Sequence, residues 1–179
     1  VWFRTTAARL WPPETLAAGE RQEAPAVLVE RLACFALVDN ARGQSLPFHR
    51  SEVEGSKLQT EITSVDDGRI ALRISGSTRA RAKGPWLFGD NDWKPEQEWP
   101  RSLSTEFLGA AAFDFRKGAF VEFRLVALGR RQGRTTYNGR GEDPGPAPIG
   151  LVLELAPPSW RVPPTFLNVY NADWVKKPR

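Results

Sequence analysis

The stretch Arg69–Lys83, RIALRISGSTRARAK, alternates between two kinds of residue along its length. Its even-numbered positions carry apolar or small residues, and after Ala71 its odd-numbered positions carry arginine, serine or lysine. A period of two is typical of a β-strand with one buried and one wet face. At about 3.3 Å per residue the strand would span roughly 40 Å, which is longer than most strands. We therefore expect it to bend, and Gly76 is the expected position of the bend.

The same alternation recurs on both sides of this stretch. Asp66-Asp67-Gly68 is a hairpin signal that joins it to the preceding strand. No alternation of strands with helices is present, which argues against a doubly wound nucleotide-binding fold. The sequence therefore predicts a mainly β fold, an antiparallel meander that forms a strongly curved sheet or a half-open barrel. The other alternating segments are 58–63, 103–113, 119–127 and 149–155.

The rest of the chain is predicted to flank one domain. Residues 27–156 form the single β domain, which is preceded by an N-terminal arm, 1–26, and followed by an extended arm, 157–179. The segment Val27–Val38 is ambiguous between helix and strand, but its apolar positions fit one face of a helix better than they alternate, so we expect one short helix near the N-terminus. We expect that helix to run into a strand near Phe35.

Aromatic side chains are concentrated in two proline-rich segments that cannot form regular structure. Residues 84–101, GPWLFGDNDWKPEQEWPR, hold three of the seven tryptophans. We expect this loop to fold as a lid on one end of the sheet, and the alternatives are a loop that lines a ligand cavity and one that contacts another subunit. The arm 157–179 combines prolines and aromatic residues in the same way, so its side chains must dock on something or stay exposed. The predicted contacts with a ligand or partner are Trp86, Phe88, Trp93, Trp99, Trp160, Phe166, Tyr170 and Trp174.

Composition limits the class of protein. The chain has 179 residues, of which 41% are hydrophobic and 26% charged, values ordinary for one globular domain. No apolar run approaches the roughly 18–20 residues of a membrane helix. The net charge of +4 is too small for a dedicated nucleic-acid binder. Because the sequence starts at Val1 and contains no Met, we expect a processed product or a fragment, and a lost signal peptide is compatible with it.

Residues 103–133, LSTEFLGAAAFDFRKGAFVEFRLVALGRRQG, resemble uncharacterised extracytoplasmic proteins of planctomycete-type bacteria. In those proteins a strand ends in Gly-x-x-x-aromatic-Asp, turns through basic residues, and returns as an aromatic-rich strand that ends in Ala-x-Gly. Residues 37–44, LVDNARGQ, fit the same pattern. The resemblance implies an extracytoplasmic location, periplasmic or secreted, and no chemistry. The matching positions are Gly109, Phe113, Asp114, Phe120, Phe123, Ala127 and Gly129.

No constellation of residues predicts catalysis or metal binding. Cys34 and His49 have the residue types of a thiol nucleophile site, but a packed thiol and a loop histidine explain them better. One cysteine and one histidine cannot supply the ligands of a zinc site. The acidic run Asp90-Asn91-Asp92 departs from a calcium-binding loop at Lys94 and Pro95. The sequence therefore predicts no enzyme, no cofactor and no metal site.

A basic stripe is predicted on the outer face of the long strand. It would suit phosphates or acidic polysaccharide, but acidic residues on neighbouring strands favour a solvated face with cross-strand ion pairs. The stripe consists of Arg73, Arg79, Arg81 and Lys83.

Two functions follow from these observations. The first is a non-catalytic structural or interaction module that docks on a partner protein or a sister subunit through its aromatic, proline-rich arms. The alternative is a small-ligand or glycan carrier, in which Gly76, Gly109 and Ala111 leave room for a ligand on the concave face and the tryptophan loop is a lid. Nucleic acid is not an expected partner.

Overall fold

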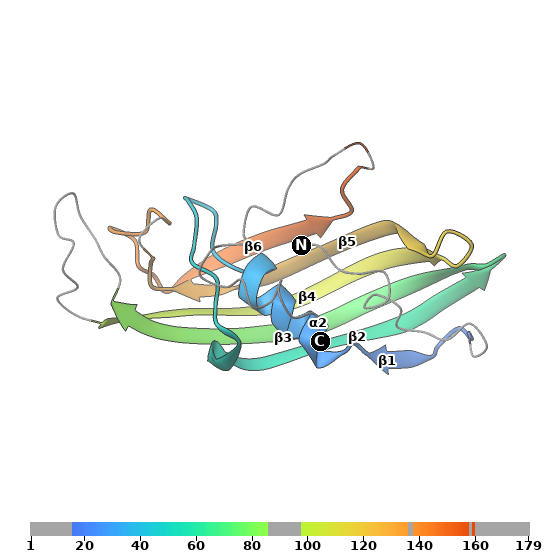
Figure 1. Ribbon diagram of the computed structural model, residues 1–179, viewed down its shortest axis with the longest axis horizontal. Helices are drawn as coiled ribbons and strands as arrows, with labels where there is room; N and C mark the ends of the chain where they lie inside the picture. Colours follow the sequence, from blue (N-terminus) through green and yellow to red (C-terminus); the bar gives the residue numbers. More distant parts are fainter. Residues whose placement is uncertain (1–15, 86–97, 136–137, 158, 160–179) are drawn as a thin grey trace.

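The computed structural model describes residues 16–85, 98–135, 138–157 and 159, and these form one antiparallel sheet with a short helical segment against one face (Figure 1). The strands follow one another in chain order across the sheet, as a meander does. The prediction of a mainly β fold is therefore confirmed. The sheet is curved and does not close, so of the two predicted forms it takes that of the curved sheet. The strands are β1 (Arg21–Glu23), β2 (Val53–Asp66), β3 (Arg69–Pro85), β4 (Glu98–Asp114), β5 (Ala119–Gln132) and β6 (Ala147–Glu154).

Two tight hairpins fix the register of the central strands. Asp67 and Gly68, both with positive φ, form the two-residue turn between β2 and β3, which is the geometry that Asp-Gly favours. Between β4 and β5, the carboxylate of Asp114 accepts a hydrogen bond from the backbone N–H of Lys117 at 3.0 Å. The first turn lies where Asp66-Asp67-Gly68 predicts it, and the second lies between the alternating segments 103–113 and 119–127, because the residues of both satisfy turn geometry locally.

The predicted short helix is present, but the strand expected near Phe35 is wrong. α2 (Ala26–Arg31) continues directly into a single π turn, η2 (Leu32–Ala36), and the N–H of Leu37 still bonds to the carbonyl of Leu32. Val29 and Leu32 are buried against the sheet. The chain stays helical because this packing places one side of the segment on the apolar face of the sheet. After η2 the chain is irregular until the short 3₁₀ turn η3 (Arg50–Glu52).

The boundaries of the predicted arms and loop differ from the observed elements. Part of the N-terminal arm is β1, whose residues 21–23 pair with residues 59–61 of β2. β3 extends to Pro85 and β4 starts at Glu98, so the sheet takes up both ends of the predicted lid loop. The rest of that loop and most of the C-terminal arm lie outside the described residues.

The inner face of the sheet carries the core. Strand residues of even number on β3 and odd number on β4 and β5 point toward α2 and η2, as the alternation predicts. The core has two contiguous clusters, one under α2 and a second around Cys34 and Phe48 at the other end of the helical segment. None of the described helices has the length and apolar character needed to cross a bilayer.

Gly76 has a packing role. It pairs with Phe107 of β4, and a Cβ at Gly76 would lie 2.6 Å from the phenyl ring and 2.1 Å from the carbonyl oxygen of Lys57. The β2–β3 register shows no shift at Gly76. Likewise, a Cβ at Gly109 would lie 3.3 Å from the side chain of Leu125. The protein's own side chains therefore fill the space that the carrier hypothesis reserves for a ligand at these two glycines.

Candidate functional site

Among the predicted aromatic contacts, only Trp99 lies in the described residues. It is half-buried on β4, and the guanidinium of Arg134 lies 5.1 Å from the centre of its ring. A cation over an indole face is attractive, and it holds the start of β4 against the chain that leaves β5. Trp99 is thus engaged within the sheet. The remaining seven are Trp86, Phe88, Trp93, Trp160, Phe166, Tyr170 and Trp174, which lie outside the described residues.

The predicted basic stripe lies on the outer face of β3, and its members differ in their surroundings. Arg73 lies 3.6 Å from a carboxylate oxygen of Glu61, and Arg81 lies 3.6 Å from one of Glu54. Both pairs join β3 to β2, as expected for a solvated sheet face. The side chain of Arg79 has no ion-pair or hydrogen-bond partner within the part of the chain that the structure describes. Lys83 is exposed at the end of the stripe.

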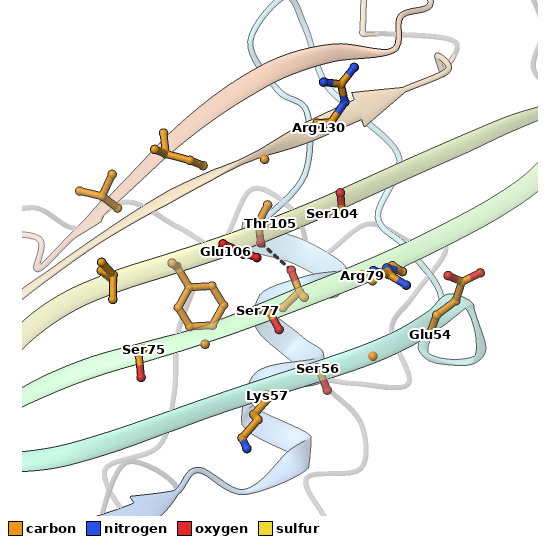
Figure 2. A pocket seen from close by; sticks show the side chains of 18 residues that line it. Glu54, Ser56, Lys57, Ser75, Ser77, Arg79, Ser104, Thr105, Glu106 and Arg130 are labelled. Atoms are coloured by element: carbon orange, nitrogen blue, oxygen red, sulfur yellow. Dashed lines mark hydrogen bonds between the residues drawn. The ribbon is translucent and has the colours of Figure 1, made fainter.

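A broad open groove runs over this outer face, on the side of the sheet opposite α2 (Figure 2). It has a volume of about 1080 Å³ and crosses strands β2 to β5. Its floor is lined by short hydroxyl side chains, among them Ser77 and Ser104. Larger side chains stand around this floor, so the hollow arises from the contrast in side-chain size. The lining includes Glu54, Lys57, Arg79, Glu106, Leu108, Val126, Leu128 and Arg130.

The strand register orders the outer face into rows that run across the strands. One row is Arg79, Ser104 and Arg130, which are direct neighbours on β3, β4 and β5, and we call it the arginine row. Strands lie about 4.8 Å apart, so the two arginine Cα atoms are separated by roughly 10 Å. Arg130, like Arg79, is exposed and has no ion-pair partner among the residues described.

An apolar strip adjoins the arginine row. Leu108 pairs with Val126 and Val126 pairs with Val152, so these side chains form a continuous line over β4, β5 and β6. Leu128 lies two positions from Val126 on the same face. Leu108, Leu128 and Val152 are 67%, 66% and 62% exposed. We call these four residues the outer apolar strip. Sequence reasoning missed it, although Leu108, Val126, Leu128 and Val152 occupy positions where the alternation predicts polar residues.

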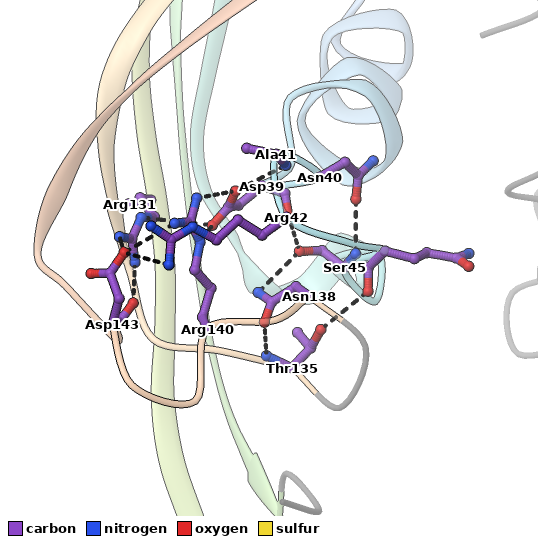
Figure 3. Close-up of polar contacts among 11 residues, drawn as sticks. Asp39, Asn40, Ala41, Arg42, Ser45, Arg131, Thr135, Asn138, Arg140 and Asp143 are labelled. Atoms are coloured by element: carbon purple, nitrogen blue, oxygen red, sulfur yellow. Dashed lines mark hydrogen bonds and ion pairs between the residues drawn. The ribbon is translucent and has the colours of Figure 1, made fainter.

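A buried ionic cluster lies at one end of the sheet (Figure 3). Asp39 accepts two hydrogen bonds from Arg140, at 2.9 and 3.0 Å, and lies 3.7 Å from Arg131. Asp143 pairs with Arg131, with Arg140 at 3.0 Å and with Arg42 at 3.5 Å. The side chains of Arg131 and Arg140 are only 4% and 8% exposed.

The cluster joins two irregular segments that are far apart in the sequence. Asn138 donates to the hydroxyl of Ser45 at 3.3 Å, and the hydroxyl of Thr135 donates to the carbonyl of Gln44. The loop after β5 is thereby tied to the loop after η2 (Figure 3). Because each buried charge has an opposite charge beside it, the ion pairs account for the arrangement, and the cluster presents no open position for a ligand. The sequence signal that was missed is Arg131, which continues the inward positions Leu125, Ala127 and Gly129.

Acid is expected to destabilise the protein through two carboxylates. The hydrogen bond from Arg131, and then the charges around it, hold the pKa of Asp143 below its usual value, and the backbone N–H of Lys117 does the same for the pKa of Asp114. A lowered folded-state pKa contributes stability that is present above the unfolded pKa of about 4 and is lost as pH falls through the folded value. Urea unfolding between pH 7 and pH 2.5 should therefore show a free energy of unfolding that declines below about pH 4.

Variants of the two carboxylates check this pH dependence. Asp143→Asn and Asp114→Asn should each flatten the decline below pH 4, whereas Glu142→Gln, next to Asp143 but exposed, should leave it unchanged. A decline in Asp143→Asn and Asp114→Asn as steep as in the wild type would contradict the assignment.

Cys34 and His49 are not brought together as a reactive pair. Cys34 is fully buried, and burial, followed by the charges of Glu30 and Glu52, raises the pKa of its thiol to about 12. His49 is exposed and caps η3, where its Nδ1 lies 2.8 Å from the hydroxyl of Ser51. The described residues also contain no group of three or more His, Cys, Asp or Glu side chains that could hold a metal ion.

Comparison of the chain with protein-family models, with curated proteins and with solved structures finds no match.

Proposed function

We propose that the protein is a non-catalytic interaction module that docks on a partner protein or a sister subunit, with the outer face of its sheet as the docking surface. The observation that carries this proposal is the outer apolar strip. The aromatic residues of 86–93 and of the C-terminal arm are proposed as further contacts. We also propose an extracytoplasmic location, which the resemblance of residues 103–133 supports.

The strip supports docking because apolar side chains exposed to water cost free energy, and packing within the fold does not account for their presence on this face. In an antiparallel sheet with one covered face, the other face ordinarily carries polar residues. Here the inner face already packs against α2 and η2, while Leu108, Leu128 and Val152 remain exposed side by side on the outer face. A contiguous apolar patch beside polar residues is typical of a protein–protein contact surface.

The described residues favour docking over the carrier function. A carrier needs an enclosed apolar cavity. On the inner face Phe107 and Leu125 fill the space beside Gly76 and Gly109, and the hollow on the outer face is open.

Charge introduced into the strip should abolish docking without unfolding the protein. A photo-reactive amino acid at Val126 should cross-link a defined partner or a second copy in the cells that make the protein. In the double variant Leu108→Glu/Leu128→Glu the yield should fall at least about 10-fold, because central apolar contacts carry much of the binding energy. The melting temperature should stay within about 2 °C, since both side chains are exposed.

The control places the same photo-reactive group at Lys117, in the exposed β4–β5 turn. If Val126 gives no product beyond that control, or the double variant cross-links as well as the wild type, the outer face is not the docking surface.

A further inference from the structure

The outer groove contains two kinds of arginine. Arg73 and Arg81 each lie 3.6 Å from a glutamate of β2, and Arg73 shares its glutamate, Glu61, with Arg21. Arg79 and Arg130 flank the hydroxyl of Ser104 and have no ion-pair partner among the described residues. These two arginines lie in the same groove as Leu108, Val126 and Leu128 of the outer apolar strip.

We propose that the groove recognises an extended acidic segment of the partner protein, whose carboxylates bind the arginine row and whose apolar side chains bind the outer apolar strip. This proposal rests on the proposed function and names the chemistry of the partner. Arginine suits this role because its planar guanidinium donates two parallel hydrogen bonds to a carboxylate.

The register sets the spacing that the partner segment needs. From the arginine row to the line of Leu108, Val126 and Val152 there are four residues along each strand, which is about 13 Å. An extended segment that follows the strand direction covers the same distance in four residues and presents alternate side chains to the groove. Glu106 and Leu128 lie midway, and Glu106 disfavours a second carboxylate there. The expected pattern is an acidic residue, a non-acidic residue two positions on, and an apolar residue four positions on.

Charge argues against the chain's own C-terminal arm as the occupant. Residues 160–179 contain four basic residues and one acidic residue, the wrong sign for the arginine row. Glu106 and the concave shape disfavour an anionic bilayer, which would meet protruding basic and apolar side chains more readily. The groove lining has no outward-facing aromatic ring on which a nucleic-acid base could stack, within the residues described.

Selection from a random seven-residue peptide library displayed on phage, against the immobilised full chain, tests the proposal. Enriched sequences should carry Asp or Glu four positions from Leu, Ile or Val. In fluorescence anisotropy, the double variant Arg79→Ala/Arg130→Ala should weaken binding of the strongest selected peptide at least about 10-fold, because it removes the charge-assisted hydrogen bonds. Replacing the acidic residue of that peptide by its amide should have the same effect on wild-type protein.

The matched control is Arg73→Ala/Arg81→Ala, which removes the same charge from the same face and should change the affinity by less than about 2-fold. Equal weakening by both double variants, or enriched peptides without acidic residues, or no enriched peptides, would overturn the proposal. Binding of phosphatidylserine vesicles that depends on Arg79 and Arg130 would also overturn it, in favour of a membrane surface. If the Val126 position still cross-links a partner while the peptide selection is negative, the proposed docking surface is retained and only the proposal of an acidic partner segment is rejected.

Discussion

Asp39→Ala is expected to lower the free energy of unfolding by about 3–5 kcal/mol, because it leaves buried positive charge without its partner. Asp39 is the carboxylate that takes both hydrogen bonds from the buried guanidinium of Arg140. Removing it leaves Arg131 and Arg140 with Asp143 alone, which is itself shared with Arg42. Urea unfolding followed by tryptophan fluorescence, with linear extrapolation to water, gives the loss directly.

An exposed ion pair and a double variant are the controls that tie the effect of Asp39→Ala to the buried cluster. Glu23→Ala breaks the exposed ion pair with Lys57, at 3.2 Å, and should cost at most about 1 kcal/mol. In the double variant Asp39→Ala/Arg140→Ala the loss should be smaller than the sum of the single losses, because one of the stranded charges is removed as well. A loss of under about 1 kcal/mol for Asp39→Ala would mean that the cluster is hydrated in solution and does not bind the two loops together.

Phe107→Ala is the second large effect, with an expected loss of about 3–5 kcal/mol. Phe107 is buried on the inner face and lies across Gly76 of β3, with Ala127 of β5 on its other side. Because both neighbours on its face are small, neither can fill the cavity that the missing ring would leave. The melting temperature should fall by roughly 10 °C in a domain of this size.

Leu108→Ala is the control for Phe107→Ala. The two residues are adjacent in β4, but Leu108 points to the outer face and is exposed, so its truncation should change stability by no more than about 0.5 kcal/mol. Equal losses for the two variants would show that the outer face is covered in the isolated protein, and would contradict both the assignment of the faces and the docking surface.

Local residue patterns predict much of the fold. The alternation around Ile70, Leu72 and Ile74 identifies the strand and its buried face, because strand geometry alone sends successive side chains to opposite sides. Asp67-Gly68 identifies the hairpin because its backbone angles are local properties of those two residues. The residue pattern also predicts the helix over residues 26–31. It does not predict the continuation of that helix as a π turn, since the π turn depends on packing against the sheet.

The candidate sites depend on contacts that no local pattern contains. Asp39 and Arg140 are separated by about a hundred positions, and the sequence offers only turn residues at both. Arg79 and Arg81 look alike in the sequence, yet a glutamate of β2 pairs with Arg81 only. Which arginine lacks a partner is decided by the register between strands.

The sequence by itself determined strands β2 to β6, the hairpin turns between them and the face that their residues take, because these follow from backbone geometry over a few residues. Only the tertiary structure decided which face α2 covers, which charges meet in the buried cluster, and that Leu108, Val126 and Val152 form one exposed line across three strands. The physical reason is that burial and ion pairing depend on distances between residues remote in the chain, and those distances exist only once the sheet has assembled.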